Sequence, residues 1–228
     1  MGVFMSMTAV RLADPAPVAD AVIGYASAHG IAAAVDHEPP GTGERDIAQV
    51  TPAGNGWNVI FWSKYFVGLG PASRWLSGDL DTLTSAVDIY DGDLWNHLLF
   101  QHGELVDRFS SCPDYFTTDR NEKAQLRRAW AGSPDTVGEA FGVEPAMIAG
   151  YLLHPYSSGL FGRALRNRRI HPDDKFELGN VWVFVDFWRR LGIDYPEPGT
   201  VLAAPEVVVR FDGEGSKAMP SGGTEFSL

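Results

Sequence analysis

The sequence predicts an α+β protein, in which an antiparallel sheet covered by helices packs on a second, helical unit. Hydrophobic residues make up 45% of the 228-residue chain and charged residues 21%, which is typical of a globular protein with a sizeable core. Strand-like runs joined by hairpin turns dominate the first half, and helix patterns dominate the second. We expect a sheet unit over 1–118, a helical unit over 119–212 and a mobile tail over 213–228.

The N-terminal unit is predicted to begin with a helix and a hairpin. Asp14-Pro15 favours a helix start, because aspartate caps a helix and proline suits its first turn. Gly30 is placed to end this helix, and a short strand over 31–35 follows. Two alternating runs then flank Gly54-Asn55-Gly56, which is typical of a tight hairpin turn.

A second helix and a three-strand meander complete this unit. The apolar positions of 72–83 fall on one side of a helix. Residues 85–111 then predict three strands, with turns at Asp91-Gly92-Asp93 and at His102-Gly103. An antiparallel sheet covered on one face by helices is the natural packing of these elements.

Proline-led helix starts organise the second unit. A helix is predicted over 122–132, and Ser133-Pro134 and Glu144-Pro145 each begin another with proline in the first turn. Residues 159–174 form a basic connector.

The most apolar segment of the chain follows this connector. Residues 177–193 have apolar side chains almost all round a helix, which predicts a central, buried element. Asp186 interrupts the run and should be paired with an arginine, because an isolated buried carboxylate is costly. Residues 205–211 predict an edge strand.

Charge and cysteine content limit the function classes. The formal net charge is −11, which disfavours nucleic acid and anionic membranes and favours a basic partner. The single cysteine allows no internal disulfide, which suits a reducing compartment. The sequence shows neither a signal-peptide pattern nor an apolar run long enough to span a membrane. We therefore expect a cytoplasmic protein, and no motif indicates a cofactor.

Residue types used in catalysis are concentrated in 100–116, but their spacing favours a hairpin arm. A nucleophilic cysteine needs a nearby cation or a helix N-terminus to lower its thiol pKa. His102 is predicted in a turn at the far end of the strand that leads to Cys112, too distant to help. His97 is nearer, so a dispersed site of His97, Asp88 and Cys112 stays an alternative.

Metal-binding patterns are incomplete. Asp88, Asp91 and Asp93 flank a glycine but lack the spacing and the closing glutamate of an EF-hand loop. The six histidines are scattered without the paired spacing of a zinc site. The sequence therefore predicts no metal site.

Residues 136–152 have the spacing of two short helices joined at Gly142-Val143. This segment resembles the helix-turn-helix core of bacterial regulators, which implies DNA binding through the second helix. That helix, predicted over 144–153, carries none of the Arg, Lys, Asn or Gln side chains that read bases. A nearby basic patch suits phosphate or an acidic protein surface; it comprises Arg163, Arg166, Arg168 and Arg169.

The function favoured by these observations is non-enzymatic binding of a protein partner in the cytoplasm, of the immunity or antitoxin kind. The four arginines of the basic patch are the expected partner-binding residues. A DNA-binding regulator using 136–152 and an enzyme with the dispersed site are the two alternatives. The sequence does not decide between a monomer and a homo-oligomer.

Overall fold

The computed structural model describes residues 2–36, 46–63, 66–156, 160–197, 206–212, 215, 219 and 220. Its described strands form one antiparallel sheet of eight, in the order β2-β8-β3-β4-β1-β5-β6-β7. The strands are β1 (Met5–Val10), β2 (Ala33–Asp36), β3 (Ile47–Pro52), β4 (Asn58–Phe61), β5 (Leu83–Tyr90), β6 (Leu94–Gln101), β7 (Glu104–Ser110) and β8 (Val207–Phe211). The predicted α+β class with an antiparallel sheet is confirmed.

The helices begin where the sequence supplies caps. They are α1 (Pro15–Ala28), α2 (Leu69–Asp79), α3 (Arg120–Ala129), α4 (Pro134–Phe141), α5 (Pro145–Ile148), α6 (Leu160–Arg166) and α7 (Val183–Arg190). The Asp14 side chain accepts a hydrogen bond from Ala16 N at the start of α1, and Ser133 accepts one from Thr136 N at the start of α4. These contacts satisfy amide groups that the first turn leaves unpaired.

The predicted hairpin turns are present. His102 and Gly103 join β6 to β7 with φ angles of 50° and 79°, the left-handed pair that a two-residue hairpin requires. Asp91 and Gly92 are also left-handed between β5 and β6. Asn55 takes a φ of 51° between β3 and β4. The turn residues therefore predicted the positions of the three hairpins correctly.

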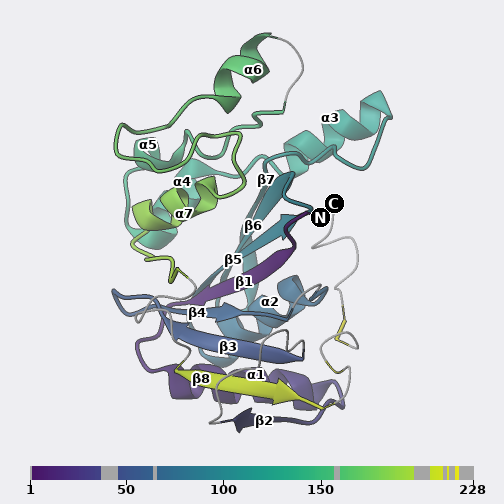
Figure 1. Cartoon of the computed structure of the whole chain (residues 1–228), viewed down its shortest axis with the longest axis vertical. Coiled ribbons are helices and arrows are strands. Elements are labelled where there is room, and N and C mark those ends of the chain that lie inside the picture. Colours follow the sequence, from purple (N-terminus) through teal and green to yellow (C-terminus); the bar gives the residue numbers. More distant parts are fainter. Residues whose placement is uncertain are drawn as a thin grey trace.

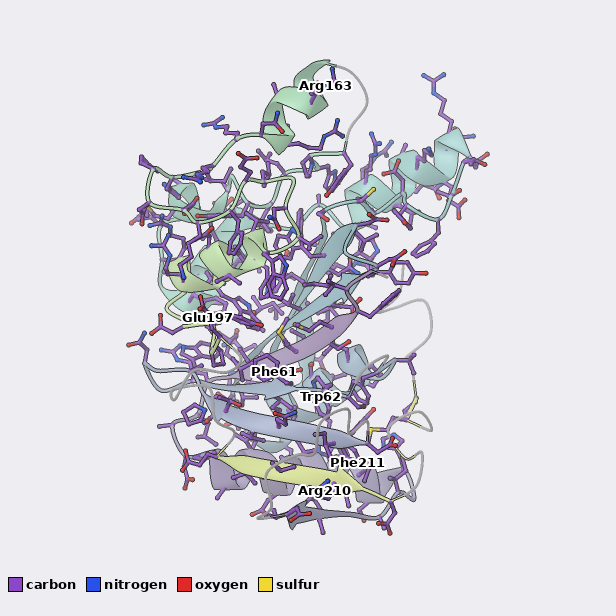
Figure 2. All side chains as sticks on the ribbon, in the orientation of Figure 1. Phe61, Trp62, Arg163, Glu197, Arg210 and Phe211 are labelled. Carbon is purple, nitrogen blue, oxygen red and sulfur yellow. The ribbon has the colours of Figure 1, made fainter. Side chains whose placement is uncertain are left out.

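Helices cover both faces of the sheet, whereas the sequence predicted one covered face. Figure 1 shows a strongly twisted sheet, with β3 and β8 lying across the view and β6 and β7 rising along it. One hydrophobic cluster joins the sheet to α1 and α2, and a second joins the opposite face to α4, α5 and α7. Figure 2 labels the neighbours Phe61 and Trp62, whose rings belong to the second and the first cluster respectively.

Two strands differ from the sequence prediction. β1 was not predicted, yet it lies in the middle of the sheet between β4 and β5. β8 was predicted as an edge strand, but it pairs with β2 on one side and β3 on the other. The prediction was wrong because the composition of a strand does not reveal how many strands pair with it. Val208 and Val209 of β8 are buried in the sheet.

Three helices also differ in length or place. α5 ends at Ile148, so the helix predicted over 144–153 is a single turn. α6 forms inside the segment predicted as a basic connector. α7 begins at Val183, because the residues from Leu178 to Trp182 form turns rather than the predicted first part of the helix.

α7 is the central buried element that its composition predicts. Trp188 has no exposed surface, and its Nε1 donates to Ser85 Oγ of β5 at 2.9 Å. Phe187 contacts the ring of Tyr151, just after α5. Asp186 accepts hydrogen bonds from the Lys175 and Phe176 amides and from Arg189 Nη2, which confirms the expected pairing with a local arginine.

Most of the predicted mobile tail, 213–228, lies outside the described residues. Met219 is an exception: it is buried in the cluster that joins α1 and α2 to the sheet. The polar, glycine-rich composition of the tail did not predict this contact.

Candidate protein-binding surface

The sheet separates two residues of the predicted dispersed site, His97 and Asp88. His97 is paired across the strands with Val87, and Asp88 is paired with Asn96. Residues directly opposite one another share a face, and neighbours along a strand face opposite ways. His97 and Asp88 therefore lie on opposite faces and cannot act on one substrate.

His97 is a core histidine. It has no exposed surface, and burial lowers its pKa to about 3, so the ring is neutral at physiological pH. Its Nε2 lies 2.9 Å from Ser85 Oγ, the same oxygen that accepts from Trp188. The chain Trp188–Ser85–His97 connects α7 to β5 and β6 through polar contacts. No substrate reaches it from solvent, so its role is packing.

Cys112 is poorly suited to nucleophilic attack. Burial raises its thiol pKa to about 11, and the carboxylate of Asp114 adds to the effect. Arg127 and Lys123 oppose it only weakly, because both already pair with Asp114 at 2.9 Å and 3.8 Å.

Ionic side chains also form a structural cluster near α7. Asp174 is buried and accepts from Tyr151 OH, His171 N and Arg190 Nη2. Arg189 reaches both Asp174 and Asp186. Every member has an internal partner, so this cluster fixes the irregular chain before α7. Over the described residues, no group of three or more His, Cys, Asp or Glu side chains is arranged to hold a metal ion.

The helix-turn-helix-like segment consists of α4 and the one-turn α5. Gly142 takes a φ of 70° at the turn between them, as the sequence predicts for that position. Ile148 of α5 is buried and Met147 is exposed. A single turn is much shorter than the helix that enters a major groove in DNA-binding proteins of this kind.

The predicted basic patch lies on α6 and the residues that follow. Arg163, Arg168 and Arg169 are exposed and form no ion pair within the part of the chain that the structure describes. Arg166 is half-buried, with its guanidinium 5.9 Å from the centre of the Tyr156 ring. Figure 1 shows α6 at one end of the molecule, away from the sheet, and Figure 2 labels Arg163 there.

A shallow cleft of about 370 Å³ lies along β7, at the edge of the sheet. Arg108, Arg128 and Ser133 line it, together with the buried Asp107. Residues 130–132 already pair with the end of β7 through Ser110 N and Arg108 O, and a register shift interrupts the ladder between Leu99 and Phe100. Both features protect an edge from further strand pairing.

No family model, no curated protein and no solved structure matches this chain. No helix in the described ranges is long and apolar enough to cross a membrane.

The most distinctive exposed feature is a set of four rings, which we call the aromatic cluster: Phe4, Tyr90, Tyr115 and Phe116. The Tyr90 ring centre lies 5.1 Å from those of Phe4 and Phe116 and 5.9 Å from that of Tyr115. All of these contacts are edge-to-face. Phe116 is 58% exposed, Tyr115 41% and Tyr90 37%, so three large rings meet solvent together.

Three separate segments build the aromatic cluster. Phe4 precedes β1, Tyr90 ends β5, and Tyr115 and Phe116 lie in the turn after β7. The N-terminal segment passes close to the β5–β6 turn: a Cβ built on Gly2 would lie 2.3 Å from the backbone oxygen of Asp91. Only glycine allows this approach. The sequence patterns do not predict the cluster, because β1 was not among the predicted strands and the rings come from segments distant in the chain.

Carboxylates surround the rings. Tyr115 OH donates to Asp93 Oδ2 at 2.6 Å, and this hydrogen bond is the main cause that raises the Tyr115 pKa to about 12. Asp91 and Asp93 are exposed, and neither forms an ion pair with another described residue. Asp114 differs, because Lys123 and Arg127 neutralise it. The surface thus combines exposed rings with two carboxylates that no described basic side chain neutralises.

Proposed function

We propose that this chain is a non-enzymatic protein-binding module whose main contact surface is the aromatic cluster. The observation that supports this proposal is the exposure of three adjoining rings, Tyr90, Tyr115 and Phe116. Contiguous apolar patches on a protein surface commonly mark interaction sites, and tyrosine is enriched among residues that dominate binding energy. The enzyme alternative is less favoured in this proposal, because His97 and Asp88 lie on opposite faces of the sheet.

The exposed arginines near α6 are a second contact surface in this proposal. Arg163, Arg168 and Arg169 have no ion-pair partner among the described residues, so an acidic region of a partner would satisfy them. A role in neutralising another protein, as immunity proteins and antitoxins do, suits a small acidic chain of this kind. It remains part of the proposal.

Co-purification from the native host tests the proposal. Tagged wild-type protein, Phe116→Ser and Met147→Ser would be compared by quantitative mass spectrometry after crosslinking. Met147 is a matched control because it is 40% exposed and lies on α5, outside the aromatic cluster. We expect one protein at near-stoichiometric yield with wild type and Met147→Ser, and at least about tenfold less with Phe116→Ser. Equal recovery with all three proteins would contradict the proposal.

A further inference from the structure

We infer that the partner of the aromatic cluster presents a basic segment, and that an arginine or lysine side chain of that segment lies against the exposed rings. This inference rests on the proposed protein-binding function, since it names the chemistry of the partner at the same surface. Three properties of the surface support the inference: its exposed rings, its negative charge and its fixed geometry.

The exposed rings attract cations through their faces. In an edge-to-face pair, the positive edge of one ring points at the negative face of the next. Tyr90 makes such contacts with Phe4, Tyr115 and Phe116. Phe116 is nevertheless more than half exposed, so much of its ring is open to a partner. A guanidinium or ammonium group that covers an exposed ring face gains a cation–π contact, and arginine does so more often than lysine.

The neighbouring carboxylates are negative and have no ion-pair partner among the described residues. Asp91 directly follows Tyr90, and Asp93 is hydrogen-bonded to the Tyr115 hydroxyl. Two basic side chains of α3, Lys123 and Arg127, are both engaged with Asp114. A cation held by the rings would therefore meet carboxylates on the same surface, and the net charge of −11 would speed its approach.

The surface is also held in place before any partner binds. The bond from Tyr115 to Asp93 joins the turn after β7 to the turn before β6. The bidentate pair between Arg127 and Asp114 joins the first of these turns to α3. Binding therefore orders few additional groups, which favours affinity.

The carboxylates of Asp91 and Asp93 disfavour an anionic membrane as the occupant of this surface.

Fluorescence anisotropy with a labelled octa-arginine peptide tests the inference. Wild type should bind it more tightly than octa-lysine and should not bind a glycine-serine peptide. Phe116→Ser should weaken binding at least about tenfold. Because this variant leaves the charge of the surface unchanged, such a loss shows that the ring itself contributes to binding. The double variant Asp91→Asn/Asp93→Asn should weaken binding and reduce its dependence on salt. Asparagine keeps an oxygen that accepts from Tyr115 OH, so the ring position is preserved.

The decisive control separates this surface from general attraction to an acidic protein. Asp135→Asn/Glu139→Gln removes two exposed carboxylates of α4, which lies on another part of the fold. This variant should bind octa-arginine within about twofold of wild type. Equal losses in the two double variants, or an unchanged affinity in Phe116→Ser, would overturn the inference.

Other binding partners of the aromatic cluster would give different experimental results. Phe116-dependent binding to phosphatidylcholine vesicles would replace the basic segment with a lipid surface. Phe116-dependent self-association in sedimentation would replace it with a second copy of the chain. If Phe116→Ser loses the native partner while octa-arginine binding does not depend on Phe116, the partner class is wrong and the protein-binding function stands.

Discussion

The carboxyl group of Asp88 lies between two strands, on the side of the sheet opposite His97. It accepts from Ser6 Oγ at 2.9 Å, and Asn96 also donates to it. Burial nevertheless raises its pKa to about 6, because the loss of hydration outweighs these two bonds. Asp88 is therefore a residue whose ionisation works against folding at neutral pH.

We expect Asp88→Asn to be more stable than wild type at about pH 8, and the difference to vanish near pH 4. The folded-state pKa lies above the unfolded value, so the folded protein binds more protons between about pH 4 and pH 6. Ionisation of Asp88 then lowers the free energy of unfolding as pH rises through that window. The gain in the variant should be about 1–3 kcal/mol.

Denaturant unfolding at several pH values measures this difference. The Asn96 side chain can accommodate the new amide, since its Oδ1 is buried without a partner in the described structure and can turn to accept. A gain that grows toward acid pH would contradict the assignment. Ser6→Ala is a useful comparison, because loss of its donor should raise the Asp88 pKa further.

The thiol of Cys112 gives a second prediction at this scale. A pKa of about 11 leaves little thiolate at neutral pH, so alkylation in the folded protein should be at least about tenfold slower than in the unfolded chain. Cys112→Ser should change binding of the native partner by no more than a few-fold. Rapid labelling, or loss of binding with the fold intact, would show that this cysteine has an active role.

Among the helices of the second half, α7 packs directly against the sheet of the first half. Its Trp188 reaches Ser85 of β5, and its Phe187 contacts Trp95 and His97 of β6. The sequence predicted this burial from apolar residues on all sides of the helix. It did not predict the polar contact with Ser85, because nothing in either segment identifies the strand residue that faces Trp188.

Trp188→Ala should lower the free energy of unfolding by about 3–5 kcal/mol, through the cavity it leaves and the lost hydrogen bond to Ser85 Oγ. Trp182→Ala is the matched control: Trp182 precedes α7 and is only partly buried. Its loss should cost clearly less. Chemical denaturation gives both values, and a small effect of Trp188→Ala, no larger than that of Trp182→Ala, would contradict the packing described here.

Sequence patterns predicted the helices and hairpins better than they predicted which strands lie side by side in the sheet. The turn residues at Gly54-Asn55-Gly56 and His102-Gly103 act locally, so the hairpins followed directly. The central position of β1 and the interior position of β8 depend on contacts distant in the chain, such as Met7 with Val87 and Val209 with Val35. The aromatic cluster was missed for the same reason, since its rings come from three separate segments.

For the whole molecule, β8 is the element that relates the two units predicted from the sequence. It lies beyond residue 206, yet it separates β2 from β3 and bonds to both. Val209 and Phe211 extend the core that contains α1. Without β8, β2 would lose its partner in the sheet, and β3 would become an edge strand with a buried face exposed to water.

A fragment of residues 1–118 should therefore fail to fold cooperatively on its own, although the sequence suggested a separate unit over this range. It would lack β8 on one side of the sheet and α7 over the other face, where Trp95, Leu99 and Phe109 are buried. Circular dichroism and thermal unfolding would compare this fragment with the full chain. Adding residues 119–228 as a separate fragment should restore structure if the contacts of α7 and β8 are what is missing. A sharp thermal transition in 1–118 alone would instead show that the N-terminal strands and helices form an independent domain.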